Sequence, residues 1–173
     1  LRIFPMDGGM GHFIAKMKKV SGTSHESQML RHKAEKDTTV VKLARELHEE
    51  LTGMKCEKDI VLKGDNVYIL PENIPDIKGF NMLSAGVNLG TIKKNRIEPA
   101  HGFFMSNKAE NLRSVVNFSH EDPLLYAFLR GEEIDTAAKG YTAVAVNGVV
   151  TGFGKASNGK LKNRYPKGLR NFK

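Results

Sequence analysis

The stretch Gly140–Lys173, GYTAVAVNGVVTGFGKASNGKLKNRYPKGLRNFK, decides the fold of the C-terminal part of this chain. It contains two Asn-Gly pairs, Asn147-Gly148 and Asn158-Gly159, and strand-like sequence flanks each of them. Asn-Gly favours a tight type I′ hairpin turn, because both central residues of that turn need a positive φ. We therefore expect a three-stranded antiparallel meander over residues 142–146, 149–157 and 160–164.

The second Asn-Gly turn sets a register that has chemical consequences. A two-residue loop places Lys155 directly opposite Lys162, and Phe153 opposite Arg164. Side chains alternate along a strand, so the cations of this hairpin are expected on one face. Two like charges that face each other cost about 0.2–1 kcal/mol, which a fold tolerates more readily when a polyanion binds there. The four cations expected on this face are Lys155, Lys160, Lys162 and Arg164.

Positive charge gathers in the same part of the chain. The 173 residues include 27 Lys/Arg and 19 Asp/Glu, which gives a formal net charge of +8. The basic residues after Asp135 have no acidic counterpart there, so residues 1–135 are neutral and the whole excess is C-terminal. Clustered positive charge is typical of a phosphate-binding surface. For charge alone, a solvated basic tail that aids solubility is the alternative.

The C-terminal segment also supplies further candidate RNA contacts. Lys167 and Arg170 add positive charge after the meander, and the ring of Tyr165 suits stacking on a base or sugar. A smaller basic cluster, at Lys93, Lys94 and Arg96, extends the predicted track. Cations of this kind contact phosphates and set the register of a nucleic acid, whereas they carry little base specificity.

An α+β domain is predicted ahead of the meander. Asp37 suits a helix N-cap and Gly53 a helix C-terminus. An apolar stripe at helical spacing lies between them and comprises Val40, Leu43, Ala44, Leu47 and Leu51. Strands are expected at 60–62, 67–70, 79–83 and 89–97, and a short helix is expected to open at Glu98-Pro99. This combination indicates a small α+β domain over residues 37–108.

A second small domain is predicted over residues 109–173. It begins with a strand at 113–118, and a helix follows with Asp122 as N-cap and Pro123 as its first residue. The buried side of that helix is expected to comprise Leu124, Leu125, Phe128 and Leu129. In the meander we expect one face of small side chains, either at a tight barrel corner or against a ligand. That face comprises Ala143, Ala145, Val150, Gly152 and Gly154.

The first 36 residues are predicted to be a hairpin and a linker. Short strands at 1–4 and 12–17 flank a glycine-rich loop, and residues 18–36 are polar without a sustained period. A lone hairpin is not stable and needs a sheet to join. Because the chain also starts at Leu1 rather than Met, we expect it to be part of a longer protein.

Several function classes find no support in the sequence. A single cysteine, Cys56, excludes an internal disulfide or a four-cysteine zinc site and fits a reducing, cytoplasmic compartment. No apolar run approaches the ~18–20 residues of a membrane span, so we expect no membrane partner. The six histidines lack metal-ligand spacing, and no nucleophile elbow or nucleotide loop occurs. We therefore predict no catalytic, cofactor-binding or metal-binding residue.

The order of these segments resembles a known family. NGKLKNRYPKGLR, at residues 158–170, resembles the terminal signature of bacterial rRNA 5-methylcytosine methyltransferases of the Sun/Nop type, in particular the RsmF-like branch. Residues 2–19 resemble the last hairpin of the family's Rossmann-like methyltransferase sheet. AGVNLGTIKKNRIEPAHG, at 85–102, resembles its first C-terminal domain. EDPLLYAFLRGEEI, at 121–134, followed by GYTAVAVNGVVTGFGK, resembles its PUA-like domain, a mixed β-barrel.

The resemblance implies a role in 16S rRNA methylation, with a division of labour. The family transfers a methyl group from S-adenosylmethionine to carbon-5 of cytosine, but its two cysteine motifs and its cofactor loop match no position here. We therefore expect no enzymatic activity and no cofactor in this chain, only the remnant hairpin of the catalytic domain followed by the two RNA-binding domains. The family motif adds Asn163 to the predicted RNA contacts.

Two functions remain open at this point. The first is an RNA-binding module that positions ribosomal RNA for the methyltransferase domain. The alternative is an intramolecular or protein-docking module, which packs on the methyltransferase domain of the same protein without touching RNA. On that alternative, Tyr165 and Leu169 are buried structural residues.

Overall fold

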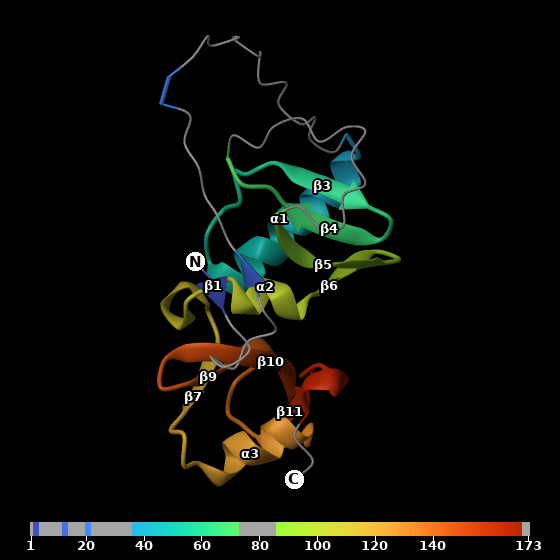
Figure 1. The fold of residues 1–173 in the computed structure, drawn as a ribbon. Helices are drawn as coiled ribbons and strands as arrows, with labels where there is room; N and C mark the ends of the chain where they lie inside the picture. Colours follow the sequence, from blue (N-terminus) through green and yellow to red (C-terminus); the bar gives the residue numbers. More distant parts are fainter. Residues whose placement is uncertain (1, 4–11, 14–19, 22–35, 73–85, 171–173) are drawn as a thin grey trace. The chain divides into compact units, whose positions relative to one another are not determined.

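The structure, a computed structural model, describes residues 2–3, 12–13, 20–21, 36–72 and 86–170 (Figure 1). The chain divides into two compact units, residues 1–30 and 31–173. In the first unit, β1 (Arg2–Ile3) pairs antiparallel with β2 (His12–Phe13), as the sequence predicts for this hairpin. The rest of that hairpin, most of the predicted linker and the predicted strand 79–83 lie outside the described residues.

The second unit begins with the amphipathic helix α1 (Thr38–Thr52). The Asp37 carboxylate accepts hydrogen bonds from the backbone N–H groups of Thr39 and Val40, at 2.9 and 3.3 Å, and so acts as the predicted N-cap. Gly53 ends the helix in the left-handed region, at φ 77°. The buried residues of the stripe are Val40, Ala44, Leu47 and Leu51.

Four antiparallel strands form the first sheet, in the order β3-β4-β5-β6. Their bounds are Ile60–Lys63, Asn66–Ile69, Val87–Lys93 and Arg96–Pro99. The predicted strand 89–97 is wrong as a single strand, because the chain reverses at Lys94, which has a φ of 50°. Pro99 is correspondingly the last residue of β6 and lies opposite Gly90, rather than in the first turn of a helix.

Two short helices follow this sheet. Helix α2 (His101–Met105) buries Phe103 and Phe104, and the 3₁₀ turn η2 spans Ala109–Asn111. The C-terminal region then contains β7 (Val115–Phe118) and α3 (Pro123–Arg130). Asp122 caps α3 by accepting from the Leu124 N–H at 2.8 Å, and Gly131 ends it at φ 95°, both as predicted. Leu125 and Phe128 are buried, but Leu124 is exposed, contrary to the prediction for that position.

A second sheet of five strands has the order β7-β9-β10-β11-β8. The new strands are β8 (Ile134–Asp135), β9 (Gly140–Val146), β10 (Val149–Ser157) and β11 (Lys160–Asn163), and η3 (Lys167–Leu169) is the last described element. Strand β7 runs parallel to β9, and the other pairs are antiparallel. The predicted meander and the predicted α+β class are confirmed, whereas the predicted domain boundaries stay predictions.

A β-bulge in β10 corrects one expectation about the meander. Val150 lies opposite Ala145, but the next pair is Gly152 with Val144, so Thr151 is an extra residue. The Thr151 hydroxyl donates to the Val144 carbonyl at 3.1 Å. Because the bulge shifts the alternation by one residue, Phe153 rather than Gly152 faces Ala143. The predicted face of small residues is therefore wrong for Gly152 and Gly154.

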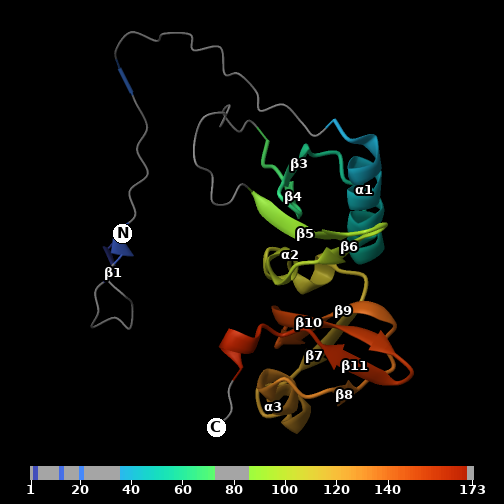
Figure 2. The same cartoon turned by 90° about the vertical axis from the view of Figure 1, so that its right-hand side faces the viewer.

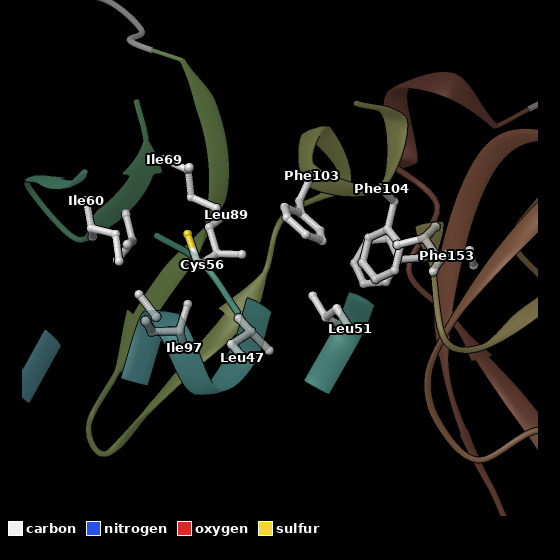
Figure 3. Close-up of a cluster of buried hydrophobic side chains, with 14 of the residues drawn as sticks. Leu47, Leu51, Cys56, Ile60, Ile69, Leu89, Ile97, Phe103, Phe104 and Phe153 are labelled. Carbon is white, nitrogen blue, oxygen red and sulfur yellow. The ribbon is translucent and has the colours of Figure 1, made fainter. Parts of the chain in front are cut away.

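The two faces of the second sheet belong to different cores. One face packs beneath α3, in a cluster that includes Phe118, Phe128, Val144 and Leu161. The other face joins Ala143, Val150 and Phe153 to the core of the first sheet and α1. Figure 3 shows Phe153 meeting Phe104 of α2, and the two rings stack with centroids 4.2 Å apart and an interplanar angle of 12°. The stacked pair thus fixes the second sheet against α2 (Figure 2).

Candidate nucleic-acid interface

The β10–β11 hairpin displays the predicted lysine pair. Asn158 and Gly159 have φ values of 52° and 77°, which forms the Asn-Gly turn. Lys155 lies opposite Lys162, and two pairs nearer the turn Lys160 lies opposite Ser157. All three lysines are exposed. The predicted register is confirmed, and with it the placement of these lysines on one face of the hairpin.

A second hairpin, β5–β6, carries a like-charge pair of the same kind. Lys93 lies directly opposite Arg96, and Lys94 occupies the turn between them. The three side chains are exposed. Two hairpins far apart in the sequence therefore each hold two cations that face each other across the strand pair. Such like-charge pairs do not stabilise the hairpins themselves.

Cations from both sheets act on Glu98 of β6. The Arg96 guanidinium donates to the Glu98 carboxylate with an Nη2–Oε1 distance of 3.0 Å. This hydrogen bond, together with the charges of Arg164 and Lys93, holds the pKa of Glu98 below its usual value, against an opposing effect of burial. Arg164 follows β11, so cations from both sheets act on one carboxylate. We name the composite basic surface for its seven cations: Lys93, Lys94, Arg96, Lys155, Lys160, Lys162 and Arg164.

Tyr141 lies at the base of this surface. It faces Lys155 across the β9–β10 pair, and the Lys155 ammonium lies 5.2 Å from the centre of its ring, within cation–π range. Burial raises the pKa of Tyr141, and the charges of Glu98 and Glu50 raise it further. The phenol is therefore kept neutral, and Lys155 occupies one side of its ring.

Carboxylates neutralise part of the positive charge. Lys160 pairs with Asp135 of β8 at 2.6 Å, and both side chains are more than half exposed. Exposed pairs of this kind contribute about 0–1 kcal/mol, so a phosphate can replace such a carboxylate at little cost. Among the described residues, Glu98 and Asp135 pair with cations of this surface and Glu50 acts on Tyr141, so the seven cations leave the surface positive.

Three of the predicted contact residues instead hold the C-terminal segment in place. The Asn163 amide donates to the carbonyls of Phe128 and Glu132, at 2.7 and 3.0 Å, and its oxygen accepts from the Tyr165 N–H at 2.7 Å. The Arg170 guanidinium donates to the Tyr165 carbonyl from Nε and Nη2, at 3.4 and 3.3 Å. These groups satisfy backbone polar atoms at the end of α3 and after β11.

The Tyr165 ring is also engaged. It lies 5.9 Å from the His101 ring of α2 and 5.6 Å from the Phe128 ring of α3, measured between centroids. Tyr165 is half-buried and Leu169 is 58% exposed. The docking alternative expects both residues to be buried, and neither is fully buried. Lys167 is exposed on η3. We therefore place Asn163, Tyr165 and Arg170 outside the composite basic surface, whereas the RNA contact predicted for Lys167 stays a prediction.

Sequence reasoning missed Tyr141, Glu98 and Asp135. Glu98 had a usable signal, because residues two apart on a strand share a face and Arg96 precedes it by two. No local sequence signal identifies Tyr141, because the β-bulge at Thr151 determines that Tyr141 faces Lys155. Asp135 comes beside Lys160 only through the pairing of β8 with β11.

The predictions of no metal, no cofactor and no membrane stay predictions. Among the described residues, no three His, Cys, Asp or Glu side chains are grouped to hold a metal ion. Cys56 is buried within the first core. In the part of the chain that the structure describes, no helix has the length and apolarity to span a bilayer.

Comparison with protein families gives two matches. Residues 44–106 match the RsmF rRNA methyltransferase first C-terminal domain, and residues 115–171 match the methyltransferase RsmF PUA domain. The first match takes in β3–β6 and α2, and the second takes in the whole β7–β11 sheet with α3. Together the two matches cover more than half of the 173 residues. The PUA-like character predicted for the second sheet is confirmed.

Proposed function

Because this chain belongs to the RsmF-like rRNA methyltransferases, as part of their C-terminal region, we propose that it is an RNA-binding module. It positions ribosomal RNA for an S-adenosylmethionine-dependent cytosine-5 methyltransferase domain. The composite basic surface makes the contact. The same proposal assigns no methyl transfer to this chain itself, so incubation with S-adenosylmethionine and rRNA should give no product.

One observation carries the proposal: two hairpins hold exposed like-charge pairs, and cations of both sheets act on the carboxylate of Glu98. Lys155 and Lys162 face each other, as do Lys93 and Arg96, and neither arrangement favours the fold in isolation. Phosphates are the ligands that neutralise such a surface, and lysine and arginine contacts to phosphate position a nucleic acid without reading its sequence. A positioning role needs this kind of contact, because the choice of base belongs to the catalytic domain.

The docking alternative draws on a separate observation. Asn163, Tyr165 and Arg170 serve the packing of the C-terminal segment, which is the role that the alternative gives them. This use of the segment is compatible with RNA binding, because the outward cations of β10 and β11 remain exposed. Loss of RNA binding on removal of those cations is what separates the two functions.

The test is a salt titration of RNA binding. The 173-residue chain and a transcribed rRNA fragment should give a log–log salt slope of about −3.5 to −4.5, for about five phosphate contacts. The variant Lys155→Ala/Lys162→Ala/Arg164→Ala should bind on the order of 100-fold more weakly, since it loses three contacts that each contribute about 1 kcal/mol net. Its slope should become shallower by about 2–3.

A charge-matched control separates the surface from net charge. Lys42→Ala/Lys55→Ala/Lys58→Ala removes the same charge from exposed positions on or after α1. This control should bind nearly as the unmodified chain does. Equal losses in the two variants, or no loss in the first, would overturn the proposed interface. Thermal unfolding of both variants shows that their folds are intact.

A further inference from the structure

The two Asn-Gly turns of the second sheet share one backbone conformation but differ in their surroundings. Asn147 and Asn158 have φ values of 48° and 52°, and the glycines that follow them have φ values of 83° and 77°. All four residues are exposed. The turns therefore form a matched pair within one chain, because conformation and exposure are nearly the same in both.

Asn-Gly is also a reactive dipeptide. The glycine nitrogen attacks Cγ of the asparagine, its proton passes to the side-chain amide nitrogen, and ammonia leaves. Water then opens the resulting succinimide to aspartate or to isoaspartate, whose main chain is longer by one methylene. Glycine favours the reaction because it has no side chain to hinder the approach of its nitrogen, and asparagine is counted among the thermolabile residues.

The attacking nitrogen is engaged in the first turn. The Gly148 N–H donates to Oδ1 of Asn117 on β7 at 2.9 Å, and the Asn147 N–H donates to the Phe118 carbonyl at 2.9 Å. The peptide between residues 147 and 148 must rotate towards the side chain before attack, so the bond to Asn117 has to break. Local openings become rarer as a segment holds more hydrogen bonds.

The corresponding nitrogen of the second turn has no such anchor. The Gly159 N–H donates to no residue in the part of the chain that the structure describes. Strand β8 contacts this turn at the next peptide, where the Thr136 N–H donates to the Gly159 carbonyl at 2.9 Å. The peptide between residues 158 and 159 therefore rotates towards Cγ of Asn158 without breaking a hydrogen bond of its own N–H.

We propose that Asn158 is a site of spontaneous deamidation, and that the Asn117 side chain protects Asn147 from the same reaction. Deamidation adds one negative charge two residues before Lys160, within the composite basic surface. Isoaspartate also lengthens the backbone of the turn that sets the lysine register. The reaction needs only water, so this modification site goes beyond the proposed function and does not depend on it.

Peptide mapping by mass spectrometry tests the proposal on the 173-residue chain, aged in its folded state at mildly alkaline pH. Asn158 should convert about fivefold faster than Asn147, which is the factor expected when one site must first break a hydrogen bond of ordinary net strength. A urea-unfolded sample is the control, in which both sites should react at similar rates. Equal rates in the folded chain, or no conversion of Asn158 there, would overturn the proposal.

Two variants of Asn117 test the protection. Asn117→Ala removes the acceptor and should raise the rate at Asn147 about fivefold. Asn117→Asp keeps an oxygen acceptor and should leave that rate low. In both variants the rate at Asn158 reports whether the fold is intact, since it should equal that of the unmodified chain. An unchanged rate at Asn147 in Asn117→Ala would overturn the protective role, and if that variant unfolds, the comparison of the two turns in the unmodified chain decides.

The effect on the composite basic surface rests on the proposed function and has a control of its own. The aged chain should bind the rRNA fragment more weakly, in step with the fraction of Asn158 converted. Asn158→Gly forms the same kind of turn but has no amide, so it should keep its affinity through the incubation. Equal losses in the two proteins would overturn this effect. Fresh protein that binds no RNA would defeat the proposed function and leave the mass measurement valid, so the two failures are distinguishable.

Discussion

The two ends of one sheet face differ completely in environment. On the β9–β10 pair, Ala143 and Phe153 lie opposite each other and are buried, at 0% and 4% exposure. Two residues along each strand, Tyr141 and Lys155 lie opposite each other on the same face, and Lys155 is exposed. Helix α2 covers the first pair, through the stack of Phe104 on Phe153, and leaves the second pair open.

This difference shows how one strand serves two functions. The alternation of side chains assigns residues to a face, but packing against α2 decides which part of that face becomes core. The covered end fixes the second sheet to the first core, and the open end presents cations beside those of the β5–β6 hairpin. Stability and binding should therefore respond separately to substitutions only a few residues apart.

The largest expected effect comes from the covered end. Phe153→Ala should lower the free energy of unfolding by about 3–5 kcal/mol, because it removes a buried aromatic ring stacked at 4.2 Å. Urea denaturation of the chain measures this. Lys155→Ala, on the same face, should change it by less than about 0.5 kcal/mol. Similar losses in the two variants would contradict the division of the face.

A smaller effect is expected where the C-terminal segment is anchored. Asn163→Ala should cost about 1–3 kcal/mol, because the Tyr165 N–H loses its acceptor and the carbonyls of Phe128 and Glu132 each lose a donor. The neighbouring substitution Lys162→Ala should leave stability nearly unchanged and weaken RNA binding. Chemical denaturation and RNA titration of the two variants measure these effects. If Asn163→Ala weakened RNA binding without loss of stability, the structural role assigned to Asn163 would be wrong.

The junction should also make stability depend on pH. The ring of His101 lies near those of Phe153 and Tyr165, its Nδ1 is buried without a hydrogen-bond partner, and burial lowers its pKa from the usual value near 6.5. A lowered pKa means that its contribution to stability is present above the unfolded pKa and is lost as pH falls through the folded value.

The check is denaturation of the unmodified chain and of His101→Phe between pH 7.5 and 5. The unmodified chain should lose stability over this range, and the variant should lose less, because it lacks the titrating ring. His120→Gln, at an exposed histidine, is the control and should follow the unmodified chain. Parallel profiles for all three proteins would rule out His101 as the cause.

The smallest effect concerns the like-charge pair at the open end. Lys162→Glu should raise stability by about 0.2–1 kcal/mol, since an opposite charge then faces Lys155, yet it should weaken RNA binding. Lys160→Glu should lower stability instead, because it replaces the partner of Asp135 with a like charge. Thermal unfolding at low salt resolves effects of this size, and the opposite signs distinguish the two positions.

Local sequence was sufficient wherever a local cause sets the structure. The Asn-Gly turns, the caps at Asp37 and Asp122, and the helix ends at Gly53 and Gly131 were all predictable from residue type. The turn at Lys94 was not, because neither Lys94 nor Asn95 is glycine and lysine seldom adopts a positive φ. Residues 89–97 consequently resembled one continuous strand.

The candidate site was predictable in its cations but not in its assembly. The lysine face followed from the turn at Asn158-Gly159, which is a local property. The approach of Lys93 and Arg96 to Arg164 depends on the stack of Phe104 on Phe153, a contact between residues nearly fifty positions apart that no local pattern reveals. The engagement of Asn163 and Tyr165 likewise depends on α3.

The extra residue in β10 determines which chemistry the meander shows to its surroundings. Regular pairing continued from the Asn147-Gly148 turn would put Gly152 opposite Ala143 and send Phe153 and Lys155 towards α3. Because the next turn ties Lys162 to Lys155, the charged side of β11 would follow, and Leu161 would face water. The bulge at Thr151 therefore makes the two Asn-Gly turns compatible in one meander, so that its apolar side chains are buried and its lysines are exposed.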